Sequence, residues 1–357
     1  MANTSILRPA ELLELCVQEQ ASDLHIAVGH APILRISGRL VPLVKHPLVT
    51  KEGAQSFCFS LMTKEQQERF VKNKDIDFSY SFESKGRFRV NVFLQQQTIS
   101  CALRLIPSKI QTIEELNLPS VLSEFTKHSQ GFVLVTGPSG HGKSTTLAAL
   151  IDQINHERAE HIVTIEDPIE YLFKDDLSII AQREVGEDVQ SFAKALRSTF
   201  RQDPDVIMVG EMRDPETMAT ALTASETGHL VFATLHTNSA SQALHRIVDS
   251  FPGEQQAQIR AQLSGSLIGV ISQRLIPRTK GGLIPACEVM MVTPAIANLI
   301  RENKPHEIPL VIETSAEQGM VSLNRALANL VRAREITLDH ALDYSLNPME
   351  LRTLARS

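Results

Sequence analysis

The order of apolar and polar residues changes near residue 106 of this 357-residue chain. Before that point, stretches that alternate apolar and polar residues, which are typical of strands, are mixed with stretches of helical periodicity. Because the two kinds of element follow no regular order, we expect a small α+β domain over residues 1–106. Its expected helices are residues 9–19 and two pieces within 50–73, and its expected strands are residues 22–28, 32–36, 39–43, 75–82, 86–94 and 98–106.

Beyond a predicted linker at residues 107–125 the pattern becomes regular, with apolar runs and helical stretches in turn. Such alternation predicts an α/β fold over residues 126–290, with a mostly parallel sheet covered by helices on both faces. The runs are residues 132–136, 162–165, 206–209 and 230–235, and the helices are residues 143–155, 189–200, 214–226 and 239–249.

The part of the chain after residue 250 is expected to be mainly helical, with a short strand near residues 286–290. We expect residues 291–357 to form a C-terminal helical bundle. Its helices are expected near residues 293–303, 320–333, 337–345 and 347–355.

A glycine-rich stretch, residues 137–144, follows the first apolar run and leads into a helical stretch. It reads Gly-Pro-Ser-Gly-His-Gly-Lys-Ser and satisfies the phosphate-loop pattern G-x-x-x-x-G-K-[ST] in the confirming context of strand, loop and helix. Main-chain N–H groups of such a loop cradle phosphate oxygens, its lysine reaches the β- and γ-phosphates, and its hydroxyl binds Mg²⁺. The candidate nucleotide-binding residues are Gly137, Pro138, Ser139, Gly140, His141, Gly142, Lys143, Ser144 and Thr145, of which Ser144 is also a candidate Mg²⁺ ligand.

Acidic residues follow two of the other apolar runs. Glu166 and Asp167 end the run at 162–165, and Glu211 follows the run at 206–209 after one glycine. In a parallel sheet these carboxylates lie at the same edge as the phosphate loop, where they can bind Mg²⁺ or activate the attacking water. We assign Glu211 to the water and Glu166 to the metal shell or to a supporting role on the water, with Asp167 as the alternative ligand. Either acidic tip taken singly could serve solvation alone, and it is the pair beside a phosphate loop that favours catalysis.

Two histidines flank the run at 230–235, with His229 before it and His236 after it. A lone histidine at a strand end is usually a surface residue or a hydrogen-bonded core residue. Because strand ends already line the predicted site, we include both among the catalytic candidates, with His236 able to sense the γ-phosphate or the water at Glu211. No cysteine or further histidine stands at the spacing of a metal site.

Arginines mark one face of the paired strands at 86–94 and 98–106. Arg87 and Arg89 alternate with Phe88, Val90 and Val92, and Arg104 is the one charged residue of the next strand. Two interpretations stay open at this point. The arginines form a solvated sheet face, or they face another surface.

Composition narrows the class of protein. The net charge of −6 and the pI near 6.1 argue against nucleic acid as the main partner. Four scattered cysteines without a C-x-x-C pair suggest neither a zinc site nor a disulfide framework. Neither a signal-like start nor a run near the ~20 apolar residues of a membrane span is present in the sequence. We expect a cytoplasmic protein that reaches a membrane only through partners.

Four motifs in a fixed order, with an early N-terminal signature, identify a family. They are the phosphate loop, an "Asp box" at residues 162–171, a Walker B segment at 205–214 and a "His box" at 227–238, with Ala-Ser-Asp-Leu-His at residues 21–25. With these motifs the chain resembles the secretion-superfamily ATPases and, within them, the PilT/PilU type of type IV pilus twitching-motility (retraction) ATPase.

The resemblance implies a PAS-like N-terminal domain, a RecA-like ATPase domain and a homohexameric ring that binds ATP and Mg²⁺ between the two domains. Arginines of the N-terminal domain reach the phosphates in such rings, so Arg87, Arg89 and Arg104 become candidate arginine fingers, which are worth roughly 10³–10⁵ in kcat. The implied partners are an inner-membrane pilus platform protein and other pilus ATPases. The implied location is the inner face of the inner membrane.

One short segment and two single residues depart from the family pattern. Residues 95–98 are Gln-Gln-Gln-Thr where retraction motors often carry an arginine followed by glycine. Ala297 occupies an arginine position in a segment linked to retraction, or it is simply a good helix former there. His141 replaces a small residue of the phosphate loop, and it either points to solvent or contacts the phosphates or a neighbouring subunit.

The sequence therefore predicts a hexameric ATPase that drives retraction of type IV pili. Three alternatives remain: an accessory, PilU-like motor that depends on a primary one, an assembly or type II secretion ATPase, and a nucleotide-regulated interaction protein with little hydrolysis. Assembly and secretion ATPases usually carry a further N-terminal domain and paired C-x-x-C motifs, which this sequence lacks. A DNA translocase is disfavoured by the acidic balance.

Overall fold

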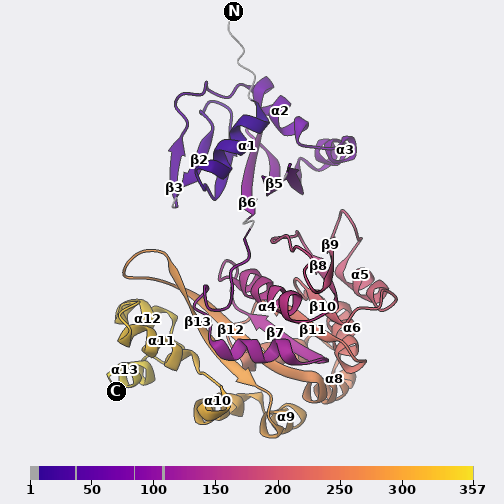
Figure 1. Cartoon of the computed structure of the whole chain (residues 1–357), viewed down its shortest axis with the longest axis vertical. Helices are drawn as coiled ribbons and strands as arrows, with labels where there is room; N and C mark the ends of the chain where they lie inside the picture. The colour runs from indigo at the N-terminus through magenta and orange to yellow at the C-terminus, as the bar shows by residue number, and fades with distance from the viewer. Residues whose placement is uncertain (1–7, 37, 84, 107–108, 357) are drawn as a thin grey trace, which may run out of the picture. The chain divides into compact units, whose positions relative to one another are not determined.

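The computed structural model describes residues 8–36, 38–83, 85–106 and 109–356, which form two compact units (Figure 1). The first unit contains the elements up to β6, and the second contains the elements from the 3₁₀ helix η1 onward. Parts of three predicted regions lie outside the described residues: 1–7, 37 and 84 of the N-terminal domain, 107–108 of the linker and 357 of the C-terminal region. No helix in the described part of the chain is both long enough and apolar enough to cross a membrane.

The first unit is a six-stranded antiparallel sheet whose one face shares a single core with three helices. Alternation along β5 decides which face is buried, since Phe88, Val90 and Val92 are fully buried and the arginines between them point the other way. The helices are α1 (Pro9–Gln18), α2 (Lys51–Ser60) and α3 (Lys64–Asn73), and the strand order is β3 (Arg39–Pro42), β2 (Ile33–Ile36), β1 (Asp23–Ile26), β6 (Thr98–Ile106), β5 (Gly86–Gln95), β4 (Asp75–Phe82).

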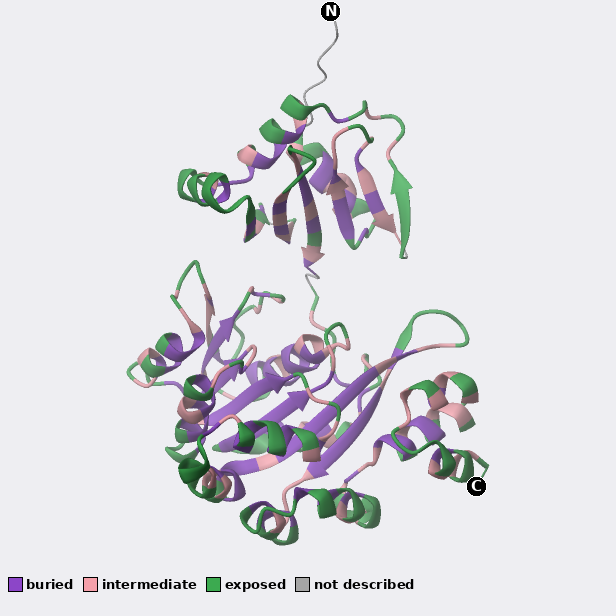
Figure 2. Cartoon of the chain, turned by 180° about the vertical axis from the view of Figure 1, so that it is seen from behind, coloured by how far each residue is buried: buried purple, intermediate pink, exposed green. Residues whose placement is uncertain are grey.

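The second unit is built on a seven-stranded sheet, mostly parallel, with a hydrophobic core on each face. Alternate residues of the central strand β11 enter different cores, Val231 on one side and Phe232 on the other. The three central strands, Gly131–Thr136, Val206–Val209 and Leu230–Leu235, are buried along their whole length, and Figure 2 colours the middle of this sheet as buried. The strand order is β13 (Leu283–Met291), β12 (Leu267–Pro277), β7 (Gly131–Thr136), β11 (Leu230–Leu235), β10 (Val206–Val209), β8 (His161–Glu166), β9 (Ile179–Glu184), and only β13 is antiparallel to its neighbour.

Helices of the second unit mostly start at a side chain that accepts an N–H group of the first turn. The caps are Ser191 of α5 (Phe192–Thr199), Asp214 of α6 (Pro215–Glu226), Ser239 of α7 (Ala240–Asp249), Thr293 of α9 (Pro294–Arg301), Ser322 of α11 (Leu323–Arg332) and Thr337 of α12 (Leu338–Tyr344). The remaining helices are α4 (Lys143–Glu157), α8 (Gly253–Ser266), α10 (Ile308–Thr314) and α13 (Pro348–Arg356), with short 3₁₀ helices η1 (Ser120–Lys127), η2 (Pro305–Glu307) and η3 (Ala316–Gln318).

Two strands of this sheet were not predicted from the sequence. The prediction of mainly helix after residue 250 is wrong for β12, an eleven-residue strand that pairs with β7 and β13. Most of β12 is buried, so its apolar run shows no alternation and cannot be told from a buried helix by periodicity. The other strand, β9, lies at the sheet edge and is half-buried over most of its length.

The last three helices form a small core of their own. Residues of α11, α12 and α13 pack with Ile276 of β12 and Ile284 of β13, beside the hairpin that these two strands form (Figure 1). The C-terminal helices therefore pack against β12 and β13, and β12 is the strand that the sequence pattern did not reveal.

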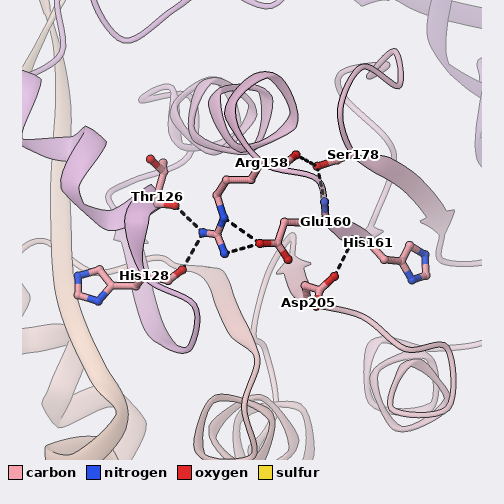
Figure 3. A network of polar contacts seen from close by, with 7 residues as sticks. All are labelled: Thr126, His128, Arg158, Glu160, His161, Ser178 and Asp205. Carbon is pink, nitrogen blue, oxygen red and sulfur yellow. Dashed lines mark hydrogen bonds and ion pairs between the residues drawn. The ribbon is translucent and has the colours of Figure 1, made fainter.

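The amino edge of the parallel strands is held by a network of charged and polar side chains (Figure 3). Arg158, which follows α4, donates to the main-chain oxygens of Thr126 and His128 at 2.6 and 2.7 Å and pairs with Glu160 at 2.7 Å. The Ser178 hydroxyl donates to the Arg158 carbonyl and accepts the N–H of Glu160. These contacts join the starts of β7, β8 and β9, so the network fixes the sheet edge opposite the phosphate loop.

Candidate active site

The phosphate loop connects β7 to α4, at the carboxyl edge of the sheet. Three of its residues have positive φ: Gly137 (+148°), Gly140 (+77°) and Gly142 (+79°). A Cβ atom on Gly137 would lie 2.5 Å from the carbonyl oxygen of Gln273, and one on Gly142 would lie 2.8 Å from Nε2 of the same residue. Glycine is required at both positions by conformation and by space.

The start of α4 suits an anion. Among the described residues, no side chain caps its amino end, in contrast to the capped helices around it. A Cβ atom on Gly140 would meet nothing within 4 Å, so the loop is open above that residue. Uncapped N–H groups, the helix dipole and this open cradle are what a nucleotide phosphate requires, so the residues present fit ATP.

Lys143 is held inside the loop although it carries a charge. It is 8% exposed, and its Nζ donates to the carbonyl oxygens of Gly137 and Pro138 at 2.9 and 3.0 Å. It also lies 3.4 Å from Nδ1 of His236, at the end of β11. The ammonium group therefore donates to neutral carbonyl oxygens that phosphate oxygens can replace.

A polar path runs from Lys143 to the carboxylate predicted to activate water. His236 Nε2 lies 3.1 Å from Glu211 Oε1, and Arg213 bridges Glu211 at 2.9 Å and Asp167 at 3.6 Å. If Nδ1 of His236 accepts from Lys143, the ring proton is on Nε2 and is donated to Glu211. The imidazole thus lies within contact distance of both Lys143 and Glu211.

Glu166 stands at the end of β8, next to the strand β10 that leads to Glu211. It is 6% exposed, and its Oε1 accepts from the Thr164 hydroxyl at 2.7 Å and from Gln182 Nε2 at 3.1 Å. A Cβ atom on Gly210 would approach the Glu166 main chain at 3.4 Å, so glycine allows the two strand ends to lie close together. The structure therefore brings Glu166, Asp167 and Glu211 to one edge, as their order in the sequence predicts.

A buried arginine of β12 and a buried glutamate of β13, which the sequence pattern did not reveal, contact the segment that follows β11. Arg274 of β12 donates to the carbonyl and the side-chain oxygen of Asn238 at 3.0 and 2.8 Å. Burial lowers the pKa of Arg274 and raises the pKa of its neighbour Glu288, whose Oε1 accepts the N–H of Ala240 at 2.8 Å. In the same loop, the buried hydroxyl of Thr237 has no partner among the described residues. This pair holds the loop that carries His236.

His141 does not simply point to solvent. Its Nδ1 accepts the N–H of Leu275 at 2.9 Å, and its ring packs edge-on against Tyr344 of α12 with centroids 6.3 Å apart. Burial, with the nearby Arg274 and Lys143, lowers the pKa of His141. The neutral ring is therefore attached to β12 and to a C-terminal helix.

One predicted residue of the second unit, His229, is not brought to the phosphate loop. His229 precedes β11, so the six residues of that parallel strand, roughly 20 Å in length, separate it from the loop edge. Its Nδ1 lies 2.9 Å from the Ala224 carbonyl oxygen, and its ring packs edge-on against Phe200. These are the contacts of a structural residue.

The three predicted finger arginines lie on the face of the first unit's sheet that the helices leave uncovered. Arg89 and Arg104 are direct cross-strand partners, and Arg104 contacts Asp23 at 3.0 Å while Arg89 lies 3.8 Å from Asp77. The Arg104 side chain is 70% exposed. It remains accessible to a further partner.

Comparison with known proteins gives the family. A family profile described as "Type II/IV secretion system protein" matches residues 5–335. The type IV pilus retraction ATPase PilT of Pseudomonas aeruginosa is 44% identical over 338 residues, which is 95% of this chain and 98% of that protein. The type IV pilus ATPase PilU of the same organism is 41% identical over 347 residues, which is 97% of this chain and 91% of that protein.

The fold comparison agrees with the sequence comparison. A crystal structure of the pilus retraction motor PilT with bound ADP matches with a TM-score of 0.91 at 45% identity, covering 97% of this chain and 99% of that one. This likeness confirms the predicted fold class, an α/β RecA-like ATPase domain with C-terminal helices after a small α+β domain. The chain belongs to the family of type II/IV secretion system proteins, and its sequence and fold place it among the ATPases of that family.

Proposed function

We propose that this protein is a homohexameric, Mg²⁺-dependent ATPase that drives retraction of type IV pili. The observation that carries the proposal is the path from Lys143 through His236 to Glu211, which joins a phosphate-binding lysine to a carboxylate able to activate water. The names of its relatives PilT and PilU supply the pilus context.

Each group at the carboxyl edge has a role in this proposal. ATP with Mg²⁺ supplies the phosphoryl group that is transferred to water and the charge that offsets the phosphate oxygens. Main-chain N–H groups of the phosphate loop, which Pro138 lacks, hold the phosphates, and Lys143 exchanges its two carbonyl partners for phosphate oxygens. Ser144 would hold the metal, with Glu166 in its shell or Asp167 as the alternative. Glu211 orients the water and accepts its proton.

His236 has a sensing role in the same scheme. It contacts both Lys143 and Glu211, so a change in the partners of the lysine changes the hydrogen bond that Glu211 receives. Glu211 is thereby aligned when the phosphates are bound. His229 is left without a role in the site of its own chain.

Arginine fingers complete the site from a neighbouring subunit in this proposal. Arg104 is the leading candidate because its side chain is the most accessible, and Arg89 stands directly opposite it. Arg87 follows on the same face of β5. The ring would act from the cytoplasm on an inner-membrane platform protein, beside other pilus ATPases, without nucleic acid.

An accessory motor of the PilU type is the second candidate. The identity to PilU, 41%, is close to the 44% for PilT and covers slightly more of this chain. Residues 95–98 lack the arginine that retraction motors often carry, and Ala297 is 9% exposed within α9. An accessory role predicts ATP hydrolysis in the purified protein but retraction only when a primary motor is present.

Fluorescent labelling of pili in living cells tests the proposed function. Deletion of the gene should leave pili that extend but do not retract, and the wild-type gene should restore retraction while a Glu211→Gln gene should not. Unchanged speed and frequency of retraction in the deletion strain would contradict a primary role. Retraction that persists but stalls under lower load would establish the accessory role.

Mixed hexamers test the arginine finger. Arg104→Ala should lower kcat by roughly 10³-fold or more. Mixing it with Glu211→Gln should recover part of the activity, because some sites then combine an intact carboxylate with an intact arginine from another subunit. Arg39→Ala, which changes an exposed arginine of the same unit, is the control and should keep full activity. Mixtures without any recovery would exclude action between subunits.

A further inference from the structure

The phosphate loop is attached along one side to β12, the long strand that the sequence pattern did not reveal. The register pairs Ser272 of β12 with Thr136, the last residue of β7, and their hydroxyl groups are 2.8 Å apart. The next residue on β12, Gln273, therefore lies beside the first residue of the loop.

Gln273 contacts the loop at its start, at its end and at the helix that follows. Its Nε2 donates to the His141 carbonyl oxygen at 2.9 Å, and its Oε1 accepts from the Thr146 hydroxyl at 2.7 Å. Its own carbonyl oxygen fills the space that a side chain at Gly137 would need, and its Nε2 does the same at Gly142. Gln273 thus leaves no space for a side chain at two of the loop glycines, whose positive φ also favours glycine.

The loop accepts a second hydrogen bond from the same strand. His141 Nδ1 accepts the N–H of Leu275, two residues beyond Gln273, at 2.9 Å. The lowered pKa of His141 favours the neutral ring that can accept this bond. The contact of the ring with Tyr344 fixes its outer side. Two hydrogen bonds donated by the strand, one from the Gln273 side chain and one from the Leu275 N–H, therefore hold the loop at His141.

We propose that Gln273 is a positioning residue that holds the phosphate loop open in the shape that receives the nucleotide, with His141 as its counterpart on the loop. This inference rests on the proposed nucleotide binding at the loop. A loop with three glycines at positive φ has many alternative conformations, and a site that is already ordered binds more tightly because less freedom is lost on binding.

The primary amide of Gln273 is chemically matched to this role. It is 2% exposed, and its two bonds to the loop and to α4 require one donor and one acceptor at fixed places, while the Cys287 thiol donates a longer bond of 3.9 Å to the same Oε1. Glutamate keeps the acceptor for Thr146 but puts an acceptor against the His141 carbonyl, and leucine keeps neither bond. A buried group that loses its partner is destabilised, so either change should release the loop.

The test uses the full-length protein without nucleotide and with ADP. In Gln273→Leu, amide hydrogen exchange of a peptide covering residues 137–146 should become faster without nucleotide, and the Kd for ADP should rise by about tenfold, as expected for the loss of one or two neutral hydrogen bonds. Ser272→Ala removes the neighbouring hydroxyl contact without touching the loop. This control should keep the exchange rate and the Kd within about twofold of wild type.

Further variants keep the test decisive if Gln273→Leu does not fold. Gln273→Glu should weaken ADP binding more than Thr146→Val, because only the glutamate opposes the His141 carbonyl. The two effects should be non-additive in the double variant. Unchanged exchange and unchanged Kd in a folded Gln273→Leu or Gln273→Glu protein would overturn the proposal.

The outcomes separate this inference from the proposed function. Faster exchange of the loop in Gln273→Leu without nucleotide supports positioning even if the cells retract their pili normally. The converse result is that the wild-type gene restores retraction while the loop of Gln273→Leu exchanges at the wild-type rate. That result would keep the proposed function and remove the positioning role of Gln273.

Discussion

The two edges of the seven-stranded sheet use similar side chains for different purposes. At the amino edge, Arg158 and Glu160 pair at 2.7 Å, and the arginine is held in addition by two main-chain oxygens. At the carboxyl edge, Lys143 is bonded to two carbonyls of a glycine loop, and Glu211 is bonded to His236 and Arg213.

The difference lies in what the charged groups are attached to. Arg158 binds segments that cannot move without disturbing several strands, so its partners are fixed (Figure 3). Glu211 and Arg213 bind other side chains on loops, and the Arg213 side chain is 59% exposed. Residue type alone therefore does not identify an active site. What distinguishes the carboxyl edge is that its charged groups are bonded to partners that a bound ligand can replace.

The largest expected effect is the difference in kcat between two glutamate-to-glutamine variants, one at each edge of the sheet. Glu211→Gln should lower kcat by roughly 10²- to 10⁴-fold, because it removes the proposed general base, while ATP binding is retained. Glu160→Gln should leave kcat nearly unchanged and lower the melting temperature instead. Steady-state ATP hydrolysis and thermal unfolding of both variants measure the contrast. A Glu211→Gln protein with full activity would remove Glu211 from the mechanism.

A smaller effect is expected for Arg158→Ala. The variant leaves Glu160 without its partner and two main-chain oxygens without a donor, which should lower the free energy of unfolding by about 2 kcal/mol. The Kd for ADP, measured well below the melting temperature, should equal that of wild type. Weaker ADP binding at full stability would mean that the two edges are coupled more closely than their contacts indicate.

The smallest effect is a pH dependence at His141. Burial first, and then Arg274 and Lys143, lower the pKa of His141 below its usual 6.5. The folded state therefore binds its proton less readily than the unfolded state does. The contribution of the neutral His141 ring to the free energy of unfolding is therefore fully present above about pH 6.5. It is lost as the pH falls through the lowered folded-state pKa.

His141→Asn separates this titration from others. Asparagine Oδ1 can accept the Leu275 N–H in place of Nδ1 and does not titrate. Melting curves from pH 7.5 to pH 5 should therefore fall less steeply for this variant than for wild type. Equal slopes would show that His141 does not contribute to the acid dependence.

The sequence predicted the parts of the site that depend on local signals. The phosphate loop is one contiguous pattern, and Glu166 and Glu211 directly follow buried apolar runs, so both could be placed at one sheet edge. The α/β class, with a mostly parallel sheet, followed from the same alternation, whereas the order of the strands within the sheet comes from the structure alone.

The partners of these residues could not be predicted because they come from distant segments. Gln182 reaches Glu166 from β9, and Gln273 reaches His141 from β12, across 132 positions of sequence. Neither strand alternates clearly, since β12 is mostly buried and β9 is an edge strand. The predicted domain boundaries and the roles of the individual site residues stay predictions.

Equilibrium titration of a fluorescent ADP analogue into Lys143→Ala and Arg158→Ala proteins tests most directly whether the carboxyl edge holds the nucleotide. Both variants remove one cation from one edge of the same sheet. The proposed site predicts that Lys143→Ala loses high-affinity binding while Arg158→Ala binds like wild type. Wild-type affinity in a folded Lys143→Ala protein, with binding lost in Arg158→Ala, would contradict it.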